Sequence, residues 1–195
     1  MASSTNSGPR PGKVYRTREF RHWSANPARF AKCLVQEGKL RRVAHGLFYV
    51  PKLSRFGEAP PDKIEVLRAF LDGSPFLISG PSKWNPLGLG STAMFASTLV
   101  YNTKRSGEFT FDGQRYLLRR VLFPAKPTPE FFAIDLIQHH HMAGVALTDL
   151  EKGLAAALSR GRSDTTRLIK MAEDFGTKAT LELVKRAIET AGLAA

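Results

Sequence analysis

The pattern of apolar and polar residues near the start of the chain predicts two short helices followed by a β-hairpin. A first helix is predicted over residues 17–23, and Asn26-Pro27 then starts a second helix, because an asparagine side chain accepts a backbone N–H and proline is fixed at a helical φ. This helix is predicted to run over 27–37. Two short apolar runs follow, at residues 40–43 and 47–50, and are expected to pair as a hairpin. Helix, turn, helix and hairpin in this order are typical of a winged helix-turn-helix.

The second of these helices is amphipathic at the helical period of 3.6 residues. Its packing face is predicted to hold Phe30, Cys33 and Leu34. Its opposite face, at spacings of three and four, carries Arg29, Lys32 and Gln36. In a winged helix these three side chains would reach base edges or phosphates, while Arg41, Arg42 and His45 on the hairpin would reach the backbone or the minor groove. Arg18, on the first helix, completes the predicted DNA-binding set.

The remainder of the chain is predicted to form a second module in which strands come before helices. A break at residues 59–63 introduces a helix over 62–71. Strands are then expected at 76–79, 97–102, 108–111 and 115–123, and helices at 130–141, 148–160, 164–174 and 177–191. Strands followed by helices predict the α+β class. The predicted organisation is a disordered tail over 1–12, a winged helix-turn-helix-like module over 13–52, and an α+β domain over 53–195 that ends in a helical bundle.

The distribution of charge favours a nucleic-acid partner. The chain of 195 residues has a net charge of +12, and residues 1–52 hold 11 Lys and Arg against two acids, a net charge of +9. Because each neutralised phosphate releases condensed counterions, a compact basic segment is the footprint expected of a double-stranded DNA binder, although charge alone is equally compatible with a solvated surface. One module of this size buries only about 600–1,000 Å² on a duplex, so a homodimer on inverted repeats is expected.

Composition places the chain among folded globular proteins. Hydrophobic residues make up 43% and charged residues 24% of the sequence. The apolar runs fall far short of the ~20 residues of a membrane-spanning helix, and residues 1–20 lack the apolar stretch of a signal peptide. A cytoplasmic protein without membrane contact is therefore expected.

Groups that could carry catalysis or bind a metal are sparse in the sequence. The single cysteine excludes an internal disulfide and a multi-cysteine metal site, and consecutive histidines at 139–141 diverge by about 100° each, which favours a surface helix end over a metal site. The acids of the body, Asp135 among them, are expected at helix termini and exposed faces, without a Ser-His-Asp order or a phosphate loop. Trp84 is expected in the core. No enzyme activity, metal or cofactor is predicted.

Two segments of the chain resemble a known family. The segment TREFRHWSANPARFAKCLVQEGKLRRVAHGLFYVP resembles the N-terminal winged helix of AbiEi-type antitoxins, with its short helix, a second helix stopped by glycine, a basic strand and a Gly-aromatic wing closed by proline. The segment SGPSKWNPLGLGSTAMFASTLVYNT is similar to the stretch that follows in that family, and the match extends in order over residues 14–160. The resemblance implies a transcriptional regulator of a type IV toxin–antitoxin operon, which represses its own promoter and is paired functionally with a nucleotidyltransferase-like toxin.

The chain departs from the family pattern at its start. A Gly/Pro-rich tail stands where family members carry a full helix before the position of Val14, so either other residues supply the missing packing or the module is degenerate. A second function therefore stays open: a protein-interaction module that neutralises a toxin or another partner directly, with the basic head incidental or RNA-binding. Apolar residues in the last helix favour this alternative if they are not all used in one small core: Leu181, Leu183, Val184 and Ile188.

Overall fold

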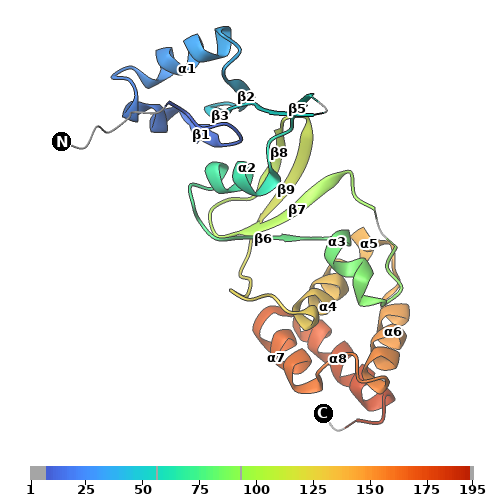
Figure 1. Cartoon of the computed structure of the whole chain (residues 1–195). Helices are drawn as coiled ribbons and strands as arrows, with labels where there is room; N and C mark the ends of the chain where they lie inside the picture. Colours follow the sequence, from blue (N-terminus) through green and yellow to red (C-terminus); the bar gives the residue numbers. More distant parts are fainter. Residues whose placement is uncertain (1–7, 56, 93, 194–195) are drawn as a thin grey trace, which may run out of the picture. The chain divides into compact units, whose positions relative to one another are not determined.

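A computed structural model describes residues 8–55, 57–92 and 94–193, which form two compact units (Figure 1). The first unit runs to Phe76 and includes Thr103–Leu117, and the second comprises Leu77–Asn102 and the residues from Leu118 onward. Helices and small sheets make this an α+β fold, which confirms the predicted class. The expected boundary after residue 52 lies inside the first unit.

The first unit is built around a three-stranded antiparallel sheet with the strand order β1-β3-β2. Its elements are β1 (Val14–Arg16), the 3-10 helix η1 (Thr17–His22), α1 (Pro27–Gln36), β2 (Arg41–Ala44), β3 (Leu47–Tyr49), β4 (Lys52–Ser54), β5 (Gly57–Ala59), α2 (Lys63–Phe70) and β8 (Gly107–Phe111). In the sheet, Val14 lies opposite Tyr49 and Tyr15 lies opposite Phe48. The predicted helices and hairpin are therefore present, and β1 adds a third strand that the sequence pattern did not predict.

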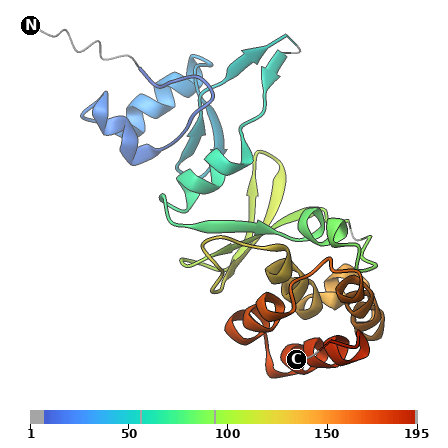
Figure 2. The same cartoon turned by 60° about the horizontal axis from the view of Figure 1, so that its bottom comes forward.

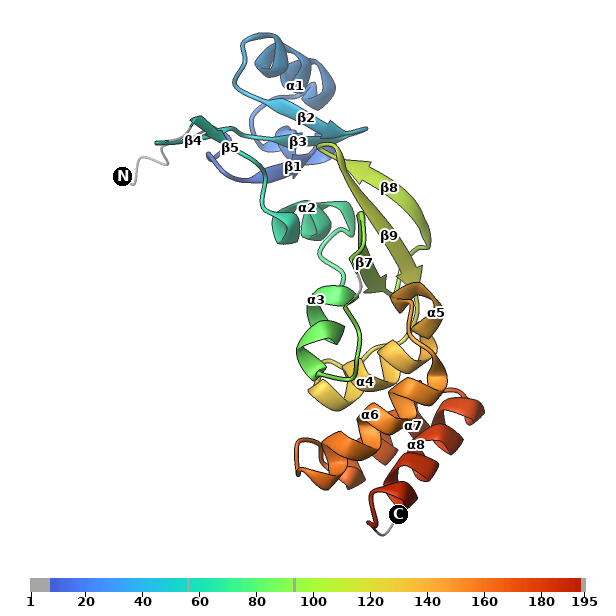
Figure 3. The same ribbon diagram turned by 90° about the vertical axis from the view of Figure 1, so that its right-hand side faces the viewer.

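Alternation along the strands gives this sheet two apolar faces. Tyr15 and Phe48 point to one face, where they pack on Phe20 with ring centroids 5.8 and 5.7 Å apart. The cluster on this face also contains side chains from α1. On the other face, Val14 and Tyr49 are buried, and α2 packs along β1. Figure 3 shows α1 and α2 on opposite sides of the sheet, so each face is covered by one helix.

The packing face of α1 differs from the predicted one at a single position. Ala31 is 1% exposed and lies between the half-buried side chains of Phe30 and Leu34, whereas Cys33 is exposed. At about 100° per residue, Ala31 shares the inward face with Phe30 and Leu34, and Cys33 lies about 200° around the helix from Ala31. The prediction that Cys33 fills the core was therefore wrong, and Cys33 lies on the polar face.

A four-stranded sheet has the strand order β6-β7-β9-β8. The strands not yet named are β6 (Phe76–Ser79), β7 (Ser97–Asn102) and β9 (Gln114–Arg120). The helices of the second unit are α3 (Pro81–Trp84), the 3-10 helix η2 (Asn85–Leu87), α4 (Pro129–Gln138), α5 (His140–Ala143), α6 (Leu147–Ser159), α7 (Thr165–Phe175) and α8 (Lys178–Thr190). The helix predicted over 130–141 is thus interrupted at His139.

The C-terminal helices form a mutually packed group, with α8 against both α6 and α7 (Figure 2). Leu183, Val184 and Ile188 are at most 3% exposed, and Leu181 is half-buried. The three buried side chains are used inside the unit, which leaves little apolar surface on α8 for a partner. Trp84 is fully buried, as predicted. In the described part of the chain, no helix has the length and apolar character needed to cross a membrane.

Candidate nucleic-acid interface

Helix α1 presents a polar face whose side chains are free to meet a partner. Asn26 caps the helix by accepting the backbone N–H of Arg29 at 3.1 Å, and Pro27 occupies its first turn, as the sequence predicts. Arg29, Lys32 and Gln36 are exposed, and neither cation forms an ion pair with another residue in the described part of the chain. The apolar face of α1 is held by the core beneath it, so these three predicted residues are brought together on one rigid surface.

The β2–β3 hairpin carries two further predicted residues, Arg42 in β2 and His45 in the turn. Arg42 and His45 are both exposed, and Arg42 Nη2 lies 3.0 Å from His45 Nδ1. Gly46, with φ at +69°, closes the turn, where its carbonyl accepts the backbone N–H of Thr17 at 3.0 Å. This contact ties the turn to the start of η1. The hairpin therefore offers a basic surface near its turn, and the turn is anchored to the helical part of the same unit.

Arg41, also predicted to contact DNA, is engaged elsewhere. Its two Nη atoms lie 3.0 Å from Glu58 Oε1 and 2.9 Å from Asp112 Oδ2, and its guanidinium is 5.5 Å from the ring centroid of Tyr49. Successive side chains of a strand point to opposite faces, so Arg41 and Arg42 cannot share a surface. Arg42 points to the opposite face of β2, where it is exposed, while Arg41 forms its ion pairs within the unit.

Arg18 is likewise paired within the first unit. The Asp72 carboxylate accepts a hydrogen bond from the guanidinium of Arg18. It also lies near two further cations, with Arg16 Nη1 at 3.2 Å from Oδ1 and Lys104 Nζ at 3.7 Å from Oδ2. Partial desolvation acts to raise the pKa of Asp72, but its three cationic neighbours outweigh this effect and hold the pKa below its ordinary value. Three cations on one carboxylate leave this corner of the unit with excess positive charge.

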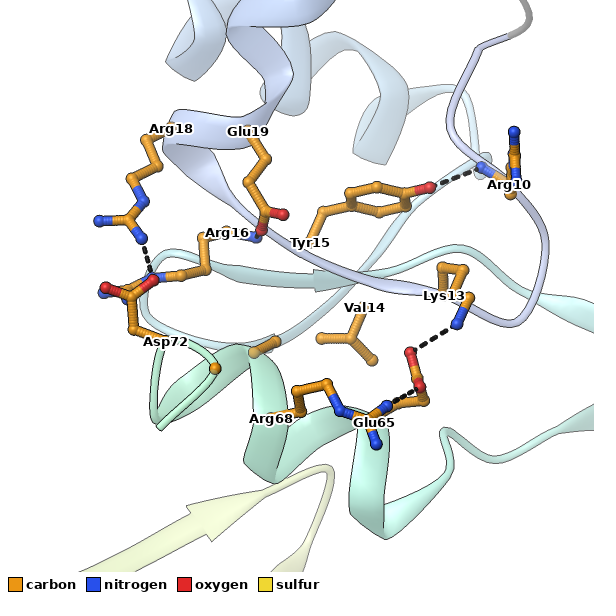
Figure 4. A pocket seen from close by; sticks show the side chains of 12 residues that line it. Arg10, Lys13, Val14, Tyr15, Arg16, Arg18, Glu19, Glu65, Arg68 and Asp72 are labelled. Carbon is orange, nitrogen blue, oxygen red and sulfur yellow. Dashed lines mark hydrogen bonds and ion pairs between the residues drawn. The ribbon is translucent and has the colours of Figure 1, made fainter. Parts of the chain in front are cut away.

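A basic pocket lies beside this corner, between β1 and α2 (Figure 4). It encloses about 550 Å³, and its charged lining residues are Arg10, Lys13, Arg16, Arg18, Arg68, Glu19, Glu65 and Asp72. Lys13 and Arg68 both pair with Glu65. The cations of this lining outnumber its carboxylates, which favours anionic partners near the first unit. The sequence shows these charges, but it does not show that α2 brings them to β1.

A separate polar centre lies inside the second unit, around Asp135 of α4. Asp135 is 3% exposed and its carboxylate accepts hydrogen bonds from the Ser79 hydroxyl, from Trp84 Nε1 at 2.8 Å and from the Tyr101 hydroxyl at 2.5 Å. Its Oδ1 also lies 3.1 Å from His139 Nδ1. The expectation that Asp135 occupies a helix end or an exposed face was wrong.

The pKa values of Tyr101 and His139 at this centre are shifted by burial and by the Asp135 carboxylate. Burial acts against the charged imidazolium, but the hydrogen bond and the charge of Asp135 outweigh it and raise the pKa of His139. Burial, followed by the charge of Asp135, raises the pKa of Tyr101. A cavity of about 440 Å³ adjoins His139 and Tyr101. The hydrogen-bonding partners named here come from β6, α3, β7 and the end of α4, so the Asp135 carboxylate joins these elements within the second unit.

Comparison with known proteins supports the fold class. No protein-family model and no curated protein matches the chain. A crystal structure of the RV2827C protein from Mycobacterium tuberculosis is similar in fold, with a TM-score of 0.57 and 13% sequence identity. The similarity covers 93% of this chain and 73% of that chain. At this identity the similarity concerns the α+β fold alone.

Proposed function

We propose that this chain is a DNA-binding transcriptional regulator that acts as the antitoxin of a toxin–antitoxin operon and represses its own promoter. In this proposal α1 enters the major groove, with Arg29, Lys32 and Gln36 at base edges and phosphates. Arg42, in β2, and His45, in the β2–β3 turn, contact the DNA backbone beside it. The resemblance to AbiEi-type antitoxins adds the operon context and the pairing with a nucleotidyltransferase-like toxin.

The observation that carries the proposal is the division of α1 into two faces. Phe30, Ala31 and Leu34 hold the helix on the core, and the opposite face leaves two unpaired cations and an amide in solvent. An arginine can bind guanine through two hydrogen bonds, a glutamine can do the same with adenine, and a lysine suits a phosphate. A rigid helix with these three side chains on one face has the chemistry needed to read a duplex.

The first test is an electrophoretic shift assay with duplex DNA from the region upstream of the gene. If about four to six phosphates are neutralised per protomer, log K should fall with log salt at a slope of about −4 to −5. An unrelated duplex of equal length measures the non-specific component. Absence of any complex at low salt would exclude the proposal.

The assembly on DNA is proposed to be a pair of protomers on an inverted repeat. The basic first units repel one another, so any contact between protomers is assigned to the second unit. Half-site centres should then lie about one helical turn, or a multiple of it, apart. A footprint the length of one half-site, filled by one protomer, would contradict this assembly.

Direct neutralisation of a toxin by protein contact is the less favoured alternative. One of its two supports, besides the missing first helix of the basic head, is apolar surface on the last helices, and Leu183, Val184 and Ile188 are buried within the second unit. Co-purification with the product of the neighbouring gene separates the two functions. A stable stoichiometric complex without DNA affinity would favour the alternative.

A further inference from the structure

The hairpin formed by β4 and β5 is exposed on both of its faces. Its strands pair in antiparallel register from Lys52 opposite Ala59 to Ser54 opposite Gly57. All three residues of β4 are exposed, and Leu53 is 82% exposed. A two-stranded hairpin that buries so little apolar surface is only marginally stable by itself. Its shape must therefore be maintained by contacts at its base.

Two contacts hold the base of the β4–β5 hairpin to the rest of the first unit. The Tyr49 hydroxyl, at the end of β3, donates to the carbonyl of Ala59 at 2.8 Å. Arg41 pairs with Glu58 at 3.0 Å and also reaches Asp112, the residue after β8. Arg41, expected at the DNA surface, is thus a positioning residue for the hairpin.

The same contacts leave the hairpin with excess positive charge. Glu58 is the only acid in the sequence from 52 to 59, against the two cations Lys52 and Arg55, and it pairs with Arg41, which also pairs with Asp112. Lys52 and Arg55 are exposed and form no ion pair with any residue that the structure describes. An exposed, basic, two-stranded ribbon has the dimensions and the charge that fit a groove of duplex DNA.

The position of the hairpin along the sheet places it away from the β2–β3 turn. The turn lies at one end of β3, and β4 follows the other end after only two residues, an arrangement that can be followed in Figure 3. The eleven residues from His45 to Arg55 include turns, so these two residues lie within roughly 33 Å of one another, the length of the fully extended backbone. This upper limit is about one turn of B-DNA, about 34 Å. One duplex is therefore long enough to contact both basic segments.

We propose that the β4–β5 hairpin is a second DNA-binding arm, which uses Lys52 and Arg55 to contact phosphates on the flank of the site opposite to that contacted by the β2–β3 turn. This inference rests on the proposed function and extends it to residues outside the winged-helix pattern. The arm reads no bases, because both cations are assigned to phosphates, so its contribution is the same for every sequence.

The test compares the wild-type chain with the double variant Lys52→Ala/Arg55→Ala. Each lost phosphate contact lowers the magnitude of the salt slope by about 0.9, so the slope should fall by about 2 and affinity at 0.1 M salt should fall roughly 10- to 60-fold. Hydroxyl-radical footprinting should show the loss of protected positions on one flank alone. The variant Lys152→Ala/Arg160→Ala, which removes the same charge from exposed positions of the second unit, is the matched control and should keep the wild-type slope.

The outcomes separate this inference from the proposed function. If the wild-type chain binds duplex DNA and the Lys52→Ala/Arg55→Ala variant keeps both the slope and the footprint, the arm does not contact DNA and the inference is wrong. If the substitutions instead change the sedimentation mass of the free protein and leave the footprint intact, the hairpin is a protein-binding arm and the inference is equally wrong. If the wild-type chain binds no duplex, the proposed function fails together with the arm.

Discussion

Replacing Asp135 by alanine is expected to lower the free energy of unfolding of the second unit by about 3–5 kcal/mol. The carboxylate accepts hydrogen bonds from three donors, on Ser79, Trp84 and Tyr101, and each of these residues is at most 4% exposed. A buried donor that loses its acceptor costs roughly 1–3 kcal/mol. The three costs do not add fully, because the donors can pair with one another and because a buried charge is removed at the same time.

The measurement follows Trp84, which is fully buried beside Asp135. The chain has two tryptophans, so a Trp23→Phe background leaves fluorescence that reports on the second unit alone. Urea unfolding in this background should show a lower midpoint for Asp135→Ala with an unchanged m-value. Glu173→Ala, an exposed acid on α7, is the control and should shift the free energy by no more than about 0.5 kcal/mol. A loss of less than about 1 kcal/mol for Asp135→Ala would refute the view that this carboxylate organises the core of the unit.

Three further predictions concern titration and DNA recognition. The pKa of His139 is raised in the folded state, so its protonation stabilises the second unit fully below pH 6.5, the ordinary pKa of the unfolded chain, and this stability should be lost as pH rises through the folded pKa. Urea midpoints from pH 5 to 9 should show this loss in the wild type and not in His139→Gln. The lowered pKa of Asp72 stabilises the first unit above 3.8, so acid unfolding followed by Trp23 fluorescence should be less steep in Asp72→Asn. Arg29→Ala should relax sequence preference, whereas Arg42→Ala should weaken binding to all duplexes and lower the salt slope by about 1, as competition assays can measure.

The elements that the sequence predicts well are those with local signals. Helix α7 begins after Asp164, whose side chain accepts the N–H of Arg167, and α8 begins after Thr177, which caps in the same way. A cap and an apolar period of 3.6 residues lie within the helix itself, so both can be recognised without knowledge of the fold. By contrast β1, β4 and β5 have three residues each and show too few positions for an alternating pattern.

In the candidate site, too, features set by neighbouring residues can be predicted from the sequence, and contacts between residues far apart in the sequence cannot. The exposed face of α1 follows from helical spacing alone, and its three predicted residues lie together as expected. The pairing of Arg41 with Asp112 joins residues 71 positions apart, and the bond from Ser79 to Asp135 joins residues 56 positions apart. Contacts at these separations depend on the tertiary arrangement. No pattern near Arg41 or Asp135 could have revealed them.

The position of Cys33 on α1 permits a direct test of the proposed DNA interface in the unmodified protein. Cys33 is exposed, and it is the only cysteine, so maleimide labelling reports on the face that also carries Arg29, Lys32 and Gln36. With duplex DNA from the upstream region at about ten times its dissociation constant, labelling should slow by about tenfold, because the helix lies in the groove in the bound fraction. If fluorescence anisotropy shows the DNA to be bound while Cys33 reacts at the rate of the free protein, α1 does not enter DNA and the account is contradicted.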